Sequence, residues 1–251
     1  MQRQVCDTLA RGFIVSHIDL SGTQVSSRAL ARITQALEKG CWPVAVPETM
    51  HSTATEYGLR SSKRAGCVDP ESQLEVFNLS GSSSVTDMSW DRLSKALTMS
   101  INGNVRPRHP KLVEVRLRCC RLSDTMALVK SLVAAAPLLE ALDVSYNELG
   151  DSIPEEIGSL THLRHLDLSS NQLTGPLPEQ LKRLRHLHQL LLWRNRLQGA
   201  SAFLCFGAER CFSLMRYVDT CTGPIEPHIF EAMEDLEELW LSVRYMLRPS
   251  G

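Results

Sequence analysis

The sequence lacks any long hydrophobic run. Near its start the only apolar run is Phe13-Ile14-Val15, which is far too short for the core of a signal peptide. No stretch approaches the roughly 18 apolar residues that a membrane-spanning helix requires. We therefore expect no membrane segment and a cytoplasmic protein. Two arginines and one acidic residue among the first dozen residues leave a mitochondrial presequence as the alternative.

An excess of charge of one sign is also missing. Lys plus Arg is 27 and Asp plus Glu is 28, which gives a net charge of −1 and indicates no general polyanion binder. Eight cysteines are present, but none forms a C-x-x-C pair, so neither a zinc ribbon nor a redox motif is indicated. In an intracellular protein we expect these thiols to be free.

What the sequence does contain is a repeated spacing of apolar residues. The pattern L-x-x-L-x-L-x-x-N-x-L fits three units that start 24 residues apart, at Leu139, Leu163 and Leu187. A fourth unit starts at Leu112 and has Cys120 in the asparagine place. Such periodic self-similarity is typical of a solenoid built from stacked units.

Weaker copies of the pattern flank these four units. Looser copies start at Val15 and Leu74, and a unit at Leu236 keeps the leucines but loses the asparagine. Two further units are weaker still, at residues 41–46 and 214–217, and Asp219 stands where the second unit should continue with an aliphatic residue. The repeats therefore extend beyond the regular block in both directions.

By this pattern the chain resembles a leucine-rich repeat protein from about residue 13 to 247. Residues 139–197 resemble the 24-residue plant-specific style, and the longer units with helical returns resemble the ribonuclease-inhibitor style. The resemblance implies an α/β solenoid, a curved horseshoe with a parallel sheet on its concave face and helical or 3₁₀ returns on its convex face. We expect one domain over residues 1–251, with irregular repeats at 13–111, regular repeats at 112–199 and degenerate repeats at 200–247.

The spacing itself explains how the units would stack. Leu166 and Leu168 alternate with polar residues, the period of a short strand with one buried face. The bend after each strand leaves backbone donors and acceptors inside the core, and an asparagine side chain can satisfy both. We therefore expect Asn147, Asn171 and Asn195 to form a buried ladder. Cys120, Ser82 and Thr23 should do part of the same work.

The return segments differ along the chain. Residues 26–40, 89–97 and 123–137 are predicted to be helices. In the first, Leu30, Ile33 and Leu37 should face inward; in the last, Met126, Val129, Leu132 and Val133 should. Prolines at 154, 176 and 178 and Gly175 forbid long helices in the central units, so 3₁₀ or extended returns are expected there. Residues 49–73 and 101–111 are predicted to be irregular.

Residues that could carry chemistry have simpler explanations. His162 and His186 hold the same place in consecutive repeats, about 4.8 Å apart, and could seat a metal with His165 or His188. We favour the simpler explanation, that both come from a repeated T/R-H-L and face solvent at a strand start. Cys119 and Cys120 should point to opposite faces, as a neighbouring exposed thiol and a ladder residue. With no H-E-x-x-H or G-x-S-x-G motif, we expect no enzyme, no cofactor and no metal.

The variable strand positions should instead form a binding surface on the concave face. Aromatic residues and arginine dominate binding hot spots, whereas Asp143 and Asp167 are explained as structural residues of the repeat. The candidate partner-binding residues are Arg116, Arg118, Tyr146, His165, Leu191, Trp193, Arg194, Arg216 and Trp240.

We therefore interpret the chain as a non-catalytic scaffold or adaptor that binds another protein. The alternatives are a surface recognition protein, a regulator like the activators of the Ran GTPase, and an RNA-associated subunit that uses the basic residues between Arg106 and Arg121. Overall charge makes nucleic acid the less favoured partner. The last strand should also expose an open edge that a partner or a second copy covers.

Overall fold

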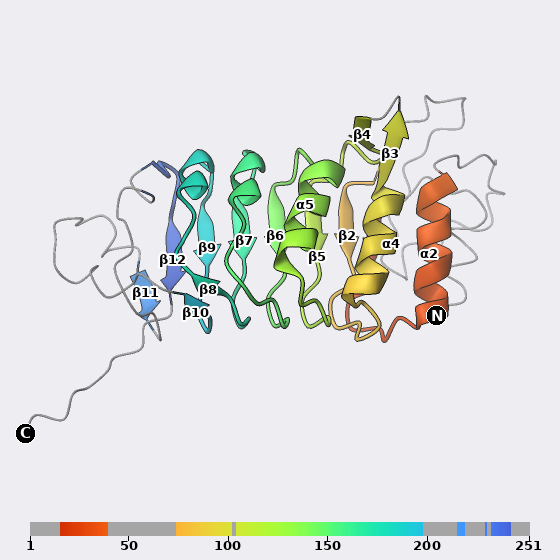
Figure 1. Cartoon of the computed structure of the whole chain (residues 1–251), viewed down its shortest axis with the longest axis horizontal. Helices are drawn as coiled ribbons and strands as arrows, with labels where there is room; N and C mark the ends of the chain where they lie inside the picture. Colours follow the sequence, from red (N-terminus) through yellow and green to blue (C-terminus); the bar gives the residue numbers. More distant parts are fainter. Residues whose placement is uncertain are drawn as a thin grey trace, which may run out of the picture.

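The computed structural model describes residues 16–39, 74–101, 104–197, 215–218, 229 and 232–241. Eight of its strands form one sheet, and three α-helices, α2 (Ser27–Lys39), α4 (Asp87–Leu97) and α5 (Thr125–Ala135), lie side by side over one face of it (Figure 1). Every strand pairing in this sheet is parallel. The sheet strands, in spatial order, are β1 (His17–Asp19), β2 (Val76–Asn78), β5 (Glu114–Arg116), β6 (Ala141–Asp143), β7 (His165–Asp167), β9 (Gln189–Leu191), β12 (Glu238–Leu241) and β11 (Met215–Val218).

The alternation of side chains along each strand places one residue in the core. The buried central residues, each at most 2% exposed, are Ile18, Phe77, Val115, Leu142, Leu166, Leu190 and Leu239. The residues before and after each of them lie on the opposite face, which the helices leave uncovered. We call this uncovered face the concave face. The fold is the α/β leucine-rich repeat solenoid that the spacing predicts.

A repeated backbone contact joins each unit to the one before it. At the start of β7, the N–H groups of Arg164 and His165 both donate to the carbonyl of Glu140, at 2.8 and 3.0 Å. At the start of β12, the N–H groups of Glu237 and Glu238 likewise donate to His188, at 2.8 and 2.9 Å. The unit of β12 therefore stacks on the unit of β9 in the same way as consecutive units elsewhere.

The asparagine ladder lies inside the solenoid. The Asn171 amide donates to the carbonyls of Val144 and Leu168 at 3.1 and 3.0 Å, and its oxygen accepts from the N–H of Leu149 at 3.2 Å. Asn147 and Asn195 make the corresponding bonds one repeat earlier and later. Each asparagine thus links its own turn to the preceding unit, as predicted.

Smaller groups occupy the ladder position in the N-terminal units. Ser82 donates to the carbonyl of Thr23 at 3.1 Å, and Thr23 donates to that of Leu20 at 2.6 Å. Cys120 has weak contacts from its thiol to the carbonyls of Leu79 and Arg118, at 3.6 and 3.7 Å. These residues provide part of the ladder, because the Ser82 and Thr23 hydroxyls donate one hydrogen bond each and the Cys120 thiol makes only weak ones.

The returns change from α-helices to 3₁₀ turns along the chain, as predicted. Helix α5 begins after Asp124, whose carboxylate accepts from the N–H of Ala127. The central units return through η2 (Glu155–Ser159) and η3 (Glu179–Arg183). Gly158 has to be glycine, because a Cβ there would lie 2.4 Å from the carbonyl oxygen of Gln180. The thin returns therefore pack directly against one another.

One inward-facing residue was assigned wrongly. Leu30, Ile33 and Leu37 of α2 and Val129 and Leu132 of α5 are buried, and Val133 packs against the core. Met126, however, is 44% exposed, and Leu128 occupies the buried position. The helix begins with Thr125, so Met126 lies in its first turn, and the 3.6-residue period places Leu128 and Leu132 on the inner face.

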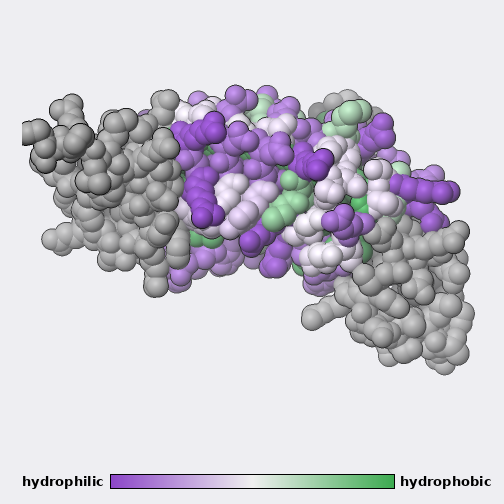
Figure 2. Space-filling view, turned by 90° about the horizontal axis from the view of Figure 1, so that it is seen from below, coloured by the Kyte–Doolittle hydropathy of each residue, from purple (hydrophilic) through white to green (hydrophobic). Residues whose placement is uncertain are grey.

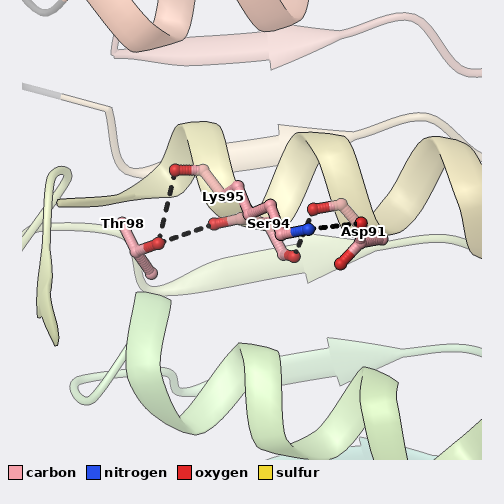
Figure 3. Close-up of polar contacts among 4 residues, drawn as sticks. All are labelled: Asp91, Ser94, Lys95 and Thr98. Carbon is pink, nitrogen blue, oxygen red and sulfur yellow. Dashed lines mark hydrogen bonds and ion pairs between the residues drawn. The ribbon is translucent and has the colours of Figure 1, made fainter. Parts of the chain in front are cut away.

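Residues 101–111 also differ from the prediction. They contribute to an antiparallel hairpin of β3 (Thr98–Ile101) and β4 (Asn104–Pro107) that starts where α4 ends. Figure 3 shows this end of α4, where the Thr98 hydroxyl donates to the carbonyls of Ser94 and Lys95 at 3.2 and 3.3 Å. Lys95 forms an ion pair with Asp91 at 2.7 Å. The prediction of an irregular segment was wrong here because Asn, Gly and Pro are also common in the turns of hairpins.

The order of the last two strands is a third correction. The unit at 214–217 was expected to follow β9, but β12 pairs with β9 and β11 lies outside it. Leu236, Leu239 and Leu241 keep the leucine pattern that residues 214–219 lose, so the better match occupies the next place in the stack. The outer strand at this end is β11 rather than β12. The unit predicted at 41–46 and the irregular segment 49–73 lie outside the described residues.

A second, small sheet lines the central units. Strand β8 (Thr174–Gly175) pairs in parallel with β10 (Arg196–Leu197), and Ser152 forms a bridge with Thr174. These short pairings lie just after the asparagine ladder, so the thin repeats are joined along two edges rather than one.

Candidate binding surface on the concave face

In the six described units from β1 to β9, one position turns the chain out of the strand with a positive φ angle. In the two N-terminal units it is a glycine, Gly22 or Gly81, with φ of 67° and 82°. In the next four units it is a residue with a side chain, and φ lies between 52° and 56°: Cys119, Tyr146, Ser170 and Arg194. This left-handed conformation disfavours residues with a Cβ. Two candidate site residues, Tyr146 and Arg194, therefore have a strained backbone conformation.

The strand ends show which residues the fold itself requires. In four units the last strand residue is Asp or Asn, and its oxygen accepts from the N–H of a serine two positions later: Asp19 to Ser21, Asn78 to Ser80, Asp143 to Ser145 and Asp167 to Ser169. The structural reading of Asp143 and Asp167 is thus confirmed. Two units depart from this Asx–Ser pattern. Strand β5 ends with Arg116, and Arg118 stands in the serine position; strand β9 ends with Leu191, and Trp193 stands in the serine position.

These departing residues meet across the intervening repeats. The Arg118 guanidinium lies over the ring of Tyr146, 4.5 Å from its centroid. The centroid of Tyr146 lies 6.0 Å from that of Trp193, with the rings at 81° to each other. The Arg194 guanidinium lies 5.3 Å from the Trp193 ring. We call Arg118, Tyr146, Trp193 and Arg194 the arginine–aromatic row.

The row spans a repeat that offers only small side chains. Tyr146 and Trp193 belong to units on either side of the β7 unit, which carries Ser169 and Ser170 at the corresponding positions. Ser169 is fully buried and Ser170 half-buried. These serines were not predicted as site residues, because a serine at these positions carries no signal until the repeats are aligned with one another.

Charge on this part of the concave face is largely balanced. Arg116 forms an ion pair with Glu114 on its own strand. Burial raises the pKa of Asp167, and nearby Asp143 raises it further, while hydrogen bonds from Ser169 and the charge of Arg118 oppose the increase. Arg118 is exposed, and within the described residues its guanidinium donates no hydrogen bond. It is thus a cation held by an aromatic ring with its hydrogen-bond donors available.

The other predicted site residues lie apart from the row or outside the description. His165 is exposed, and its ring centroid is 6.3 Å from that of His188. Leu191 is half-buried beside Asp167 in the strand register. The strands place Trp240 opposite Leu191 and include Arg216 in β11, but the side chains of these two residues lie outside the described set.

The buried Cys120 thiol lies in the position of a structural residue. Cys119 is exposed and Cys120 is buried, and burial raises the pKa of the Cys120 thiol to about 12. This thiol therefore stays protonated and is suited to its ladder position rather than to nucleophilic attack. Among the described residues, no group of three or more His, Cys, Asp or Glu side chains could hold a metal ion.

The surface beyond the row is mostly polar. Figure 2 views the molecule from below the orientation of Figure 1, and its described part is largely hydrophilic with small hydrophobic areas. Large apolar side chains that are exposed elsewhere include Met88 and Val105, at 74% and 62%. None of the helices in the described parts has the length and apolar character to cross a membrane.

Comparisons with known proteins agree with this architecture. Residues 137–197 match the family model described as leucine rich repeat. No curated protein matches the chain. A structure of the Arabidopsis receptor kinase HAESA, with the peptide hormone IDA and the co-receptor SERK1, shows the same fold with a TM-score of 0.50 and 18% identity, covering 92% of this chain and 27% of that one.

Two further Arabidopsis structures are similar over shorter stretches. A chain of the BIR3–SERK2 complex is 36% identical over 40% of this chain and 53% of its own length, with a TM-score of 0.34. The ectodomain of the receptor kinase SOBIR1 is 22% identical, covers 73% of this chain and 77% of its own, and has a TM-score of 0.40. The chain thus spans about half of the BIR3–SERK2 chain and about a quarter of the HAESA chain.

Proposed function

We propose that this chain, a leucine-rich repeat protein, is a non-catalytic scaffold or adaptor that binds a protein partner through its concave face. The observation that carries the proposal is the departure of the β5 and β9 units from the Asx–Ser pattern. At these positions the fold accepts Asp or Asn followed by Ser, and the hydrogen bond between them closes the turn. Arginine, leucine and tryptophan give up that bond, so a use other than folding explains them.

The physical character of the row supports binding rather than catalysis. Its contacts are cation–π and edge-to-face contacts, which fix large side chains in place before a partner arrives. Preorganised aromatic and arginine side chains lose little conformational entropy on binding and are typical of hot spots. HAESA, which shares the fold, was solved with a peptide hormone and a co-receptor; the proposal for this chain rests on its own residues.

Other parts of the interpretation stay predictions. The whole chain is proposed to act as one repeat domain, with its outer strand β11 as a second place where a partner or another copy could pair. The cytoplasmic location expected from the sequence also stays a prediction. Three alternatives remain: a surface recognition protein, a GTPase regulator and an RNA-associated subunit. Each predicts a different kind of partner in an affinity-capture experiment.

The proposal is tested by affinity capture with the purified chain as bait. We compare the wild type with Trp193→Ala/Arg194→Ala and with Lys182→Ala/Arg183→Ala, a control pair on the exposed part of η3. Protein partners should be lost from the first variant and retained by the second. Equal retention of every partner by both variants would show that the concave face is not the binding surface, and nuclease-sensitive capture would favour the RNA-associated alternative.

A further inference from the structure

The arginine–aromatic row places a cation and an apolar surface within reach of one short ligand segment. The Arg118 guanidinium lies 4.5 Å from the Tyr146 centroid on one side, and the Trp193 ring lies 6.0 Å from it on the other. Leu191 adds a second apolar side chain on the β9 unit. A ligand that crosses this part of the face therefore meets a positive charge first and an apolar surface next.

The cation is available to a ligand although carboxylates lie near it. The Asp143 carboxylate accepts from both the N–H and the hydroxyl of Ser145, at 3.0 and 2.6 Å. Asp167 accepts from the N–H of Ser169 at 2.9 Å. Both carboxylates are engaged in their own turns, and Arg118 forms no ion pair with either within the described residues. The Tyr146 ring restricts the guanidinium without using its N–H donors.

The other arginine of the β5 unit is not equivalent. Arg116 is already paired with Glu114 on the same strand, so an incoming anion would have to compete with that contact. Arg118 would instead gain a bidentate, charge-assisted pair, which is the stronger and more directional class of hydrogen bond. The charge recognition is thus assigned to one residue.

The spacing selects an extended peptide over a helix. Residues i and i+2 of an extended chain point to the same side and are separated by about 6.5–7 Å. Arg118 and Trp193 lie 4.5 and 6.0 Å from the centroid of the same tyrosine ring, so the two groups are at most about 10.5 Å apart, and side chains i and i+2 that diverge slightly can reach both. Side chains i and i+4 of a helix would also be close, but a helix presents its apolar residues as a stripe along one face, whereas here a single apolar site adjoins a single cation.

We propose that the concave face recognises an extended peptide segment of a protein partner that carries an Asp or Glu two residues away from a large apolar side chain. The carboxylate pairs with Arg118, and the apolar side chain packs on Trp193 and Leu191. This inference rests on the proposed function and specifies the partner class for the same surface. It predicts an internal acidic residue as the recognised group, so a free C-terminus is not required.

The probe is a display library of random peptides fused at their C-termini, so that no free carboxyl terminus is present. Selection on the wild-type chain should enrich Asp or Glu two positions from an aromatic or aliphatic residue. Selection on Arg118→Gln should lose the acidic preference and keep the apolar one. Arg164→Gln serves as the control, because Arg164 is an exposed arginine near the start of β7, ion-paired at its Nε with Glu140 at 3.4 Å, and it should retain both preferences.

The selected sequence is then measured as a synthetic, amidated peptide by fluorescence anisotropy. Replacing its acidic residue by Gln or Asn should weaken binding to the wild type at least tenfold, and the same replacement should change binding to Arg118→Gln less than twofold. Thermal unfolding followed by circular dichroism confirms that the variant is folded. An acidic preference that persists in Arg118→Gln, an equal affinity for acid and amide peptides, or enrichment of nothing would overturn the inference.

The two proposals fail in distinguishable ways. If Trp193→Ala/Arg194→Ala loses its captured partners while acid and amide peptides bind the wild type equally, concave-face binding stands and only the acidic specificity is wrong. If capture is unaffected by the double variant, the proposed function itself is wrong, whatever the peptides show.

Discussion

The units with α-helical returns (the helical units) and the units with 3₁₀ returns (the thin units) contribute strands to the same sheet but support the turn after each strand differently. The units of β1, β2 and β5 have α-helical returns and serine, threonine or cysteine at the ladder position. The units of β6, β7 and β9 carry a ladder asparagine, and the β6 and β7 units return through 3₁₀ turns. A helix brings its own hydrogen bonds and a wide apolar face, so the turn beneath it needs less support. Where the return is thin, a side-chain amide has to satisfy the bend.

The two halves also differ in what they present to a partner. At the positive-φ position the first two units have glycine, which leaves the end of the concave face bare. The thin units carry Tyr146 and Arg194 at that position and accept a strained backbone to do so. The strained backbone positions that carry large side chains thus lie in the region that we propose for binding, whereas glycine relieves this strain at the opposite end.

Substitutions in the ladder should give the largest difference in stability loss between the helical half and the thin half. Asn171→Ala removes hydrogen bonds to the carbonyls of Val144, Leu168 and Ser169, which keep other donors, and leaves the N–H of Leu149 without a partner in the core. We therefore expect a loss of about 3 kcal/mol in unfolding free energy. Ser82→Ala removes one bond and should cost about 1 kcal/mol. Urea unfolding followed by far-ultraviolet circular dichroism measures both. Equal losses would show that the two halves do not depend on the ladder to different degrees.

Acid should affect the halves in opposite directions. His109, fully buried at the end of the hairpin in the helical half, has its pKa lowered to about 4 by burial and by the charge of Arg108. The unfolded chain binds this proton first, so stability falls as pH decreases from 6.5 toward 4, by about 2 kcal/mol between pH 7 and pH 5. The comparison of wild type with His109→Gln in urea at these two pH values isolates the effect.

Asp167, in the thin half, gives the unfolding free energy the opposite dependence on pH. Burial raises its pKa above 3.8, so the folded chain takes up this proton before the unfolded chain does. Its contribution to stability therefore increases as pH falls through the raised pKa, and Asp167→Asn should abolish that increase. An acid-induced loss that is the same in wild type and His109→Gln would remove this distinction between the halves.

Exchanging residues at the positive-φ position should give the smallest effects. Gly81→Ser introduces a side chain at a φ of 82° and should cost about 1 kcal/mol, although the space around Gly81 is open apart from backbone atoms 3.7 Å away or more. Ser170→Gly relieves the same conformation and should stabilise the chain by about 0.5 kcal/mol, because glycine's unfolded-state entropy offsets part of the gain. Thermal unfolding midpoints report both changes, and a stabilising Gly81→Ser would contradict the strain argument.

Much of the fold could be read from spacing alone, because the repeat is a local pattern. The leucines at 163, 166 and 168 specify a strand and its buried side, and the prolines specify thin returns. The spacing could not predict the order of β11 and β12. That order depends on which of these two units packs better against β9, and β12 is the one that pairs with it. Met126 was misplaced because its helix starts immediately before it, and helix ends are poorly marked by periodicity.

The candidate site could be predicted only residue by residue. Trp193 and Arg194 were singled out as large side chains at strand positions, but the contact of Arg118 with Tyr146 depends on how side chains reach across neighbouring units. Ser169 and Ser170 carry no signal as residue types. Their role follows only when the repeats are aligned and the space between two rings is considered.

The positive-φ position has a consequence for how such a coil could diversify. The backbone there keeps its course whether the residue is glycine, serine, tyrosine or arginine, since Gly22 at 67° and Arg194 at 54° lie on equivalent turns. A single substitution in each repeat can therefore change the side chains on the concave face while the backbone keeps its conformation. New affinities could arise by editing single turns rather than by rebuilding the scaffold.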